Sequence, residues 1–163
     1  MNANDHNSNQ MTKGSYTKFV GMLVASFIAM YITMYLNTYE LDHVYFSLTR
    51  FYMSCLGIAT MAIIMFVAIR SMYKNKKKNI AIVVVSVGLF VSALSLVRAQ
   101  APIVGDVLWM KAMIPHHSIA ILTSERADIK DPQVKQLAED IIKAQKKEIE
   151  DMKAMIARLE ASK

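Results

Sequence analysis

Three uncharged apolar runs constrain the fold of this chain more than any other feature. They span residues 19–39, 51–69 and 80–97. Each is close to the ~20 residues that a helix needs to cross a ~30 Å hydrocarbon core. The third run is short and rich in valine, which also fits a buried strand, but its flanking charges favour a spanning helix. We therefore predict an all-α protein with a membrane domain of three transmembrane helices at residues 19–98.

The charged residues between the runs predict the orientation of the chain. The segment at residues 70–78 is rich in Lys and Arg, whereas the segment between the first two runs carries Glu40 and Asp42. Basic segments stay on the cytoplasmic side. We therefore expect a bacterial inner (plasma) membrane protein with a disordered cytoplasmic tail at residues 1–18 and a periplasmic or extracellular C-terminal domain. The net charge of +6 is then largely a topology signal, and no nucleic acid is expected as a partner.

The last third of the chain predicts a helical hairpin at residues 105–160. Apolar residues recur at helical spacing along its first half. A second helix opens with Asp131 as N-cap and Pro132 at its first position. Two helices alone bury too little apolar surface to be stable. We therefore expect a homo-oligomer, a dimer or higher, in which hairpins form a four-helix bundle.

A stretch that combines methionine with histidine, WMKAMIPHHSIA, lies in the first helix of this hairpin. Residues three or four apart share a helix face, so Met113 stands beside His116 and His117. Met110 is ~10 Å of helix rise from His117, so it would complete a different site or extend a relay. Thioether and imidazole ligands together suit copper, particularly Cu(I) rather than Cu(II), and silver.

The second helix is expected to offer further groups to this stretch. With the turn near residues 128–131, His117 would stand level with Ile142. The further residues expected near the Met–His group are Gln145 and Glu148 on the second helix, and Met152 beside Asp106 and Met110. These positions extend the candidate site beyond the two histidines.

Packing and register are the competing explanations of the same pattern. Methionine commonly fills gaps in a core, which accounts for Met110, Met152 and Met155 without a metal. Polar residues such as Gln145 and Glu148 can simply specify the register of a seam. The alternative function is therefore a structural or interaction protein whose hairpin mediates oligomerisation without metal.

The C-terminal segment resembles domain-of-unknown-function family 305. The resemblance covers residues 105–156 and is carried by Asp106, Trp109, Met113-Ile114-Pro115-His116-His117, Ala120-Ile121, Ile141-Ile142, Gln145, Glu148-Ile149 and Met152. It implies a ferritin-like helix arrangement and an association with periplasmic copper binding and copper tolerance. It also implies Met113, His116, His117 and Met152 as ligand candidates.

Two positions depart from the pattern of the family. Thr123 stands where the family often has methionine, and Met155 stands where a tryptophan is common. The first departure removes one soft ligand. It implies either weaker binding or a site shared between subunits.

The leading prediction is a membrane-anchored, extracytoplasmic copper-binding protein that buffers the metal or transfers it to a copper-handling partner. The predicted ligands are Met113, His116, His117, Met110 and Met152, with Asp106, Gln145, Glu148 and Met155 as supporting groups or further ligands. We expect neither an enzyme nor an organic cofactor, because the outer segment shows no nucleophile–base pair, phosphate loop or acid pair. The uncharged runs also argue against an ion transporter.

Overall fold

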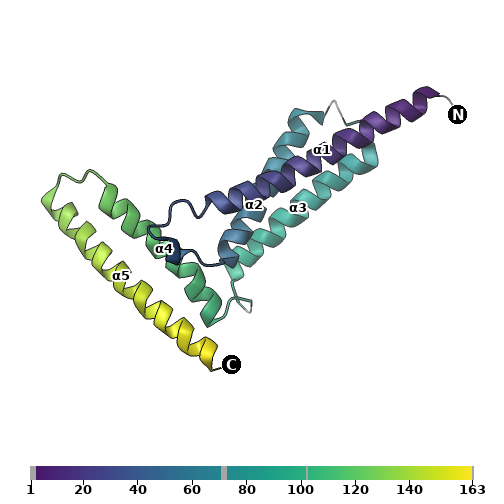
Figure 1. The fold of residues 1–163 in the computed structure, drawn as a ribbon. Helices are drawn as coiled ribbons and strands as arrows, with labels where there is room; N and C mark the ends of the chain where they lie inside the picture. The colour runs from purple at the N-terminus through teal and green to yellow at the C-terminus, as the bar shows by residue number, and fades with distance from the viewer. Residues whose placement is uncertain (1–2, 71–72, 102, 163) are drawn as a thin grey trace. The chain divides into compact units, whose positions relative to one another are not determined.

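The computed structural model describes residues 3–70, 73–101 and 103–162, with side chains described from residue 14 onward. Within these ranges the chain forms five α-helices and one short 3-10 helix, and no strand (Figure 1). This confirms the predicted all-α class. Two compact units are formed, one from residues 1–31 and 51–99 and the other from residues 32–50 and 100–163. Each unit is described by itself below.

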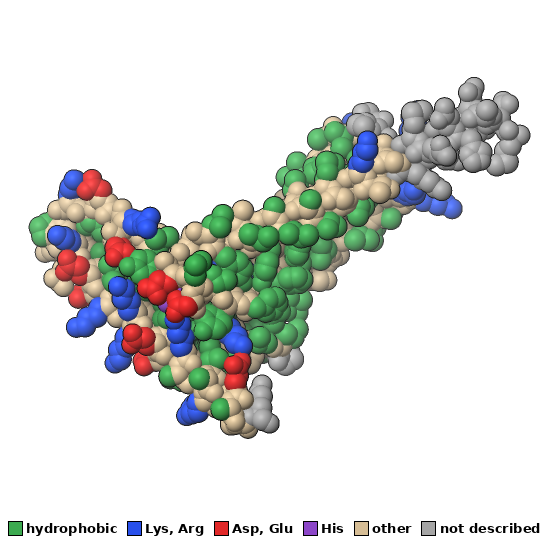
Figure 2. All heavy atoms as spheres, in the orientation of Figure 1, with side chains coloured by type: hydrophobic (Ala, Val, Ile, Leu, Met, Phe, Trp, Pro, Cys, Tyr) green, Lys and Arg blue, Asp and Glu red, His purple; other side chains and the backbone are tan. Residues whose placement is uncertain are grey.

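Among the described residues, three helices are long and apolar enough to cross a membrane, as the uncharged runs predicted. They are α1 (Ala3–Thr33), whose candidate span is Gly14–Thr33, α2 (Leu48–Ala68) and α3 (Lys76–Ala99). The valine-rich third run is helical, so its length and flanking charges were the better guide. In Figure 2 hydrophobic side chains cover the visible face of these helices, whereas charged side chains gather on the C-terminal helices.

Helix α1 differs from the sequence expectation at both ends. It begins at Ala3, so the described part of the tail expected to be disordered is helical, while residues 1–2 lie outside the described part. Once the apolar segment has nucleated a helix, each added residue gains a hydrogen bond at little further entropic cost, so polar residues extend it. The helix ends at Thr33 rather than near Tyr39, and four-residue turns follow, with Tyr35 N–H bonded to Ile32 O at 3.0 Å.

The predicted hairpin is present as two antiparallel helices, α4 (Asp106–Arg126) and α5 (Pro132–Ala161) (Figure 1). The Asp131 carboxylate accepts hydrogen bonds from the backbone N–H groups of Gln133 and Val134, at 2.9 and 3.0 Å. These bonds satisfy two donors that a helix start leaves free. The N-cap and the proline after it are confirmed as the start of α5.

The core of the second unit lies between α4 and α5. Its buried residues are Met110, Ile114 and Ile121 from α4, and Ile149, Met152 and Ile156 from α5. Tyr39 and Tyr45, from the connection between α1 and α2, pack against this core. The short 3-10 helix η1 (Leu41–His43) of the same connection contacts α4. The connection therefore adds packing that the sequence did not predict, and the hairpin is more than two isolated helices.

Candidate metal centre

The adjacent histidines of α4 point in different directions. Consecutive residues of an α-helix are about 100° apart around the axis. The rings of His116 and His117 accordingly have centroids 6.4 Å apart and planes inclined by 54°. His116 is exposed, whereas His117 is largely buried and faces α5. The two imidazoles therefore occupy different environments.

The inner histidine has a nitrogen without a hydrogen bond. His117 Nδ1 lies 3.1 Å from a Glu148 carboxylate oxygen, which is an ion-pair distance. That nitrogen is buried and has no partner with hydrogen-bond geometry in the described part of the chain. Burial lowers the pKa of His117, Glu148 opposes the shift and His116 adds to it. The lowered pKa favours the neutral imidazole, in which one of the two ring nitrogens has a lone pair that can bind a ligand.

The contact with Glu148 also corrects the expected register of the hairpin. His117 was placed level with Ile142, but it contacts Glu148, further along α5, which was itself expected near the Met–His group. A second contact shows the same offset: the Lys111 ammonium lies 2.6 Å from the carboxylate of Glu160, which is also further along α5 than the expected register places it. The connection between the helices sets this offset, and the spacing of residues within each helix carries no information about it.

The methionines of the predicted site divide by burial. Met110 and Met152 are 4% and 6% exposed and belong to the hairpin core. Met113 is half-buried and packs against that core, one helical turn before His117. Met155 is 46% exposed and stands outside it. The structure thus places Met110, Met152 and Met113 in or against one core. His117 follows Met113 by one helical turn.

The outer histidine belongs to a groove on the other side of Met113. This groove has a volume of about 650 Å³ and is lined by residues that include Asp106, Met113, His116 and Arg50. The Arg50 guanidinium donates a 3.2 Å hydrogen bond to the carbonyl of Pro115 and a second bond to the carbonyl of Met34. The groove of His116 therefore holds both a positive charge, Arg50, and a negative one, Asp106.

The predicted supporting groups Glu148 and Gln145 on α5 and Asp106 on α4 lie on two sides of the hairpin. Glu148 is half-exposed, and its carboxylate accepts a 3.3 Å hydrogen bond from the Gln145 amide. Asp106 is exposed and lines the groove of His116. Of these three residues, Gln145 and Glu148 lie on the side of the inner histidine and Asp106 on the side of the outer one.

A third histidine was missed by the sequence reasoning. His43, in η1, is 5% exposed; its Nδ1 lies 3.0 Å from Ser118 Oγ, and its Nε2 lies 3.7 and 3.6 Å from the Glu40 and Asp42 carboxylates. Asp42 also pairs with Lys153 of α5 at 2.5 Å. The cluster therefore ties the connection between α1 and α2 to both hairpin helices. Its signal was visible as two acids and a histidine directly after the first apolar run.

Burial lowers the pKa values of both His43 and His117, and the unit should respond to pH accordingly. As the pH falls through about 6.5, the ordinary histidine pKa, the two histidines take up protons in the unfolded chain before they do so in the folded chain. The stabilisation is therefore complete above that pH and is lost below it. We expect the free energy of unfolding to fall between pH 7.5 and pH 5, as measured by urea unfolding. The Asp42 ion pair persists in this range because Lys153 lowers the pKa of Asp42. Equal stability at both pH values would contradict this assignment.

Comparison with known sequences places the hairpin in a family. The profile described as Domain of unknown function (DUF305) matches residues 93–161, which cover the end of α3 and the hairpin. The chain is also 34% identical to Uncharacterized protein L153 of Acanthamoeba polyphaga mimivirus, over 138 residues that make up 83% of this chain and 88% of that protein. No solved structure matches the chain significantly. The similarity to this relative is longer than the hairpin and so includes membrane-type helices. The chain belongs to the DUF305 family.

Proposed function

We propose that the protein is a membrane-anchored binder of soft metal ions, with Cu(I) as its ligand, that buffers the metal or transfers it to a partner. The proposal takes the hairpin as the binding domain and α1–α3 as the anchor. The basic segment at residues 70–78 supports an orientation with the N-terminus in the cytoplasm and the hairpin outside. A bacterial plasma membrane is the proposed location.

One observation carries this proposal, namely the buried Nδ1 of His117, which has no hydrogen-bond partner and lies 3.1 Å from a Glu148 carboxylate oxygen. Buried polar atoms nearly always have a hydrogen-bond partner, so an exception requires an explanation. A bound metal ion would satisfy the nitrogen. The lowered pKa of His117 favours the neutral form, which is the form that binds metals.

The nature of the nearby donors supports copper over harder metals. Met113 lies one helical turn before His117, and the sulfur-bearing Met110 and Met152 lie in the adjoining core. Thioether and imidazole together favour Cu(I), whereas zinc sites usually use cysteine or several histidines. We assign His117 and Met113 as the principal ligands. Met152 would complete the site, and Met110, ~10 Å of helix rise from His117, would extend it as a relay. His116 has a lesser role because it is exposed and points in a different direction from His117.

A Cu(I) competition titration of the full chain in mild detergent tests this function. We expect His117→Gln and Met113→Leu each to weaken Cu(I) binding by about tenfold or more, the range in which even supporting groups of metal sites act. Methionine and leucine are similar in volume, so Met113→Leu should cost less than about 1.5 kcal/mol of stability. Cu(II) binding should change far less in Met113→Leu, because thioether sulfur prefers the softer Cu(I) ion.

Met22→Leu is the matched control for this titration. Met22 is 45% exposed on α1, lies in a candidate membrane span and is not part of the hairpin. Its replacement should leave Cu(I) affinity as in the wild type. The proposed function fails if His117→Gln and Met113→Leu also retain wild-type affinity.

An exposed apolar stripe on α5 favours a second function, assembly through the hairpin without metal. Val134 and Leu137 are 49% and 58% exposed, and Ile141 continues the same helix face. Such a stripe is typical of helices that pair in a bundle. Under this alternative, the copper titration shows no specific binding and the oligomeric mass in detergent is unaffected by copper. Under the main proposal, a homo-oligomer and copper binding coexist.

A further inference from the structure

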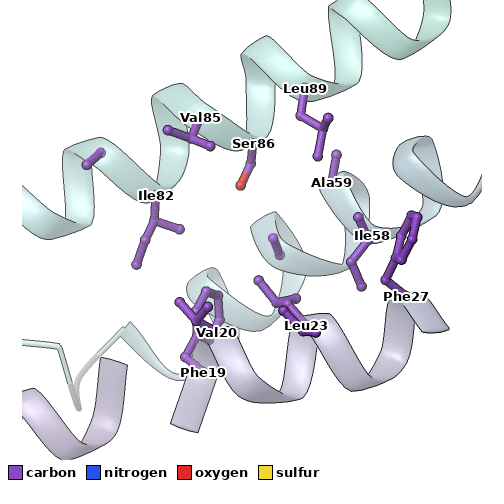
Figure 3. Close-up of a pocket in the computed structure, with 13 residues that line it drawn as sticks. Phe19, Val20, Leu23, Phe27, Ile58, Ala59, Ile82, Val85, Ser86 and Leu89 are labelled. Atoms are coloured by element: carbon purple, nitrogen blue, oxygen red, sulfur yellow. The ribbon is translucent and has the colours of Figure 1, made fainter. Parts of the chain in front are cut away.

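An apolar groove lies among the three helices of the first unit. Its volume is about 580 Å³, and it is lined by residues of α1, α2 and α3 (Figure 3). The labelled side chains are Phe19, Val20, Leu23 and Phe27 from α1, Ile58 and Ala59 from α2, and Ile82, Val85, Ser86 and Leu89 from α3. Ser86 is the one hydroxyl-bearing residue of the lining. The groove therefore suits a hydrocarbon ligand.

One end of this groove continues toward a lysine. A neighbouring hollow shares Val20, Ala81 and Ile82 with the groove and is also lined by Tyr16 and Lys78. The Lys78 ammonium lies 4.9 Å from the centroid of the Tyr16 ring. The apolar groove thus adjoins a hollow with a positive charge, at the end of the helices that carries the basic segment. That combination matches a molecule with an apolar tail and an anionic head.

Hydrogen bonds fix the structure around this lysine. The Tyr16 hydroxyl donates to Asn79 Oδ1 at 2.6 Å, and the Asn79 amide donates to the Tyr73 carbonyl at 2.8 Å. The Tyr16 and Tyr73 rings pack with centroids 4.9 Å apart. These contacts hold α1 against the start of α3. They fix the start of α3 beside Lys78, whose own side chain is exposed.

We propose that an anionic phospholipid binds here, with one acyl chain in the groove and its phosphate at Lys78. Basic pockets between membrane helices are known to bind anionic lipid headgroups. A helix of a second copy is the competing occupant. An uncharged membrane span of a second copy would bring no negative charge to Lys78, whereas an anionic phospholipid would. This inference depends on α1–α3 spanning a bilayer and not on metal binding.

Native mass spectrometry of the full chain in detergent, with added lipid, tests the proposal. The probes are phosphatidylglycerol and phosphatidylcholine with identical acyl chains. The wild type should retain phosphatidylglycerol preferentially. Lys78→Gln should lower its affinity for that lipid about fivefold, which corresponds to about 1 kcal/mol for one lysine near an anionic surface. Lys77→Gln, an exposed neighbour outside the lining, should keep the preference.

A second variant tests the apolar part of the site. Ala81 is exposed and lines both the groove and the neighbouring hollow, so Ala81→Phe should obstruct them and lower the retention of both lipids. Ala25→Phe, exposed on α1 and outside the lining, is the control and should leave retention unchanged. The proposal is wrong if the wild type shows no lipid preference, or if Lys78→Gln and Lys77→Gln act equally. It is also wrong if Ala81→Phe changes the oligomeric mass while both lipids are retained.

Discussion

Replacing Ile114 with alanine should destabilise the hairpin by about 2–5 kcal/mol, the usual cost of truncating a buried isoleucine. Ile114 is 0% exposed and lies in the core between α4 and α5. Its loss leaves a cavity that the flanking helix turns cannot close, because core side chains are already closely packed. Trp109 on α4 is the chain's one tryptophan, so urea unfolding followed by its fluorescence reports on this unit.

The control for this change is Leu137→Ala on α5. Leu137 is 58% exposed, so its truncation should alter the free energy of unfolding by no more than about 0.5 kcal/mol. A loss in Ile114→Ala as small as the one expected for Leu137→Ala would mean that the hairpin core is not where the structure places it. A large loss in Leu137→Ala alone would instead indicate that this exposed residue is covered by a partner.

Ser118→Ala should detach the connection between α1 and α2 from the hairpin. Ser118 is 0% exposed; its hydroxyl accepts the Tyr39 N–H at 2.7 Å and lies 3.0 Å from His43 Nδ1. Removing the hydroxyl leaves the Tyr39 N–H and His43 Nδ1 without this partner. Each unsatisfied group should lower the free energy of unfolding by about 1–3 kcal/mol. We expect the Tyr39 amide to lose protection in hydrogen exchange, and the unit to unfold at lower urea.

Ser124→Ala provides the comparison on the same helix. Ser124 is half-buried near the end of α4, away from this contact, and its replacement should leave the protection of the Tyr39 amide unchanged. If Ser118→Ala also leaves the protection of the Tyr39 amide unchanged, the packing of Tyr39 against the hairpin does not depend on Ser118. The assignment of Ser118 as the link between the two segments would then be wrong.

Features with a local signal could be predicted from the sequence. The spans follow from the length of uncharged runs, and the start of α5 follows from Asp131 and Pro132, because capping depends on residues within one turn. The family also follows from a motif confined to the hairpin. In the candidate site, the buried environment of Met110 and Met152 follows from helical spacing.

Features that depend on distant contacts could not be predicted in this way. His43 meets Ser118 across 75 residues, and Arg50 reaches the Pro115 carbonyl across 65. No pattern within either segment encodes these pairings. The pairing of Arg50 nevertheless shapes the surroundings of His116, because both residues line the same groove. The unequal environments of the two adjacent histidines therefore required the fold.

X-ray absorption spectroscopy at the copper edge tests the central proposal most directly. The full chain would be loaded with Cu(I) in detergent, beside Met113→Leu and the control Met22→Leu. We predict that copper in the wild type and in the control has both sulfur and nitrogen neighbours, and that the sulfur contribution falls in Met113→Leu. The protein contains one cysteine, Cys55 in α2, so a Cys55→Ser background keeps any sulfur signal assigned to methionine. A first shell of nitrogen and oxygen alone in the wild type would contradict a soft-metal site.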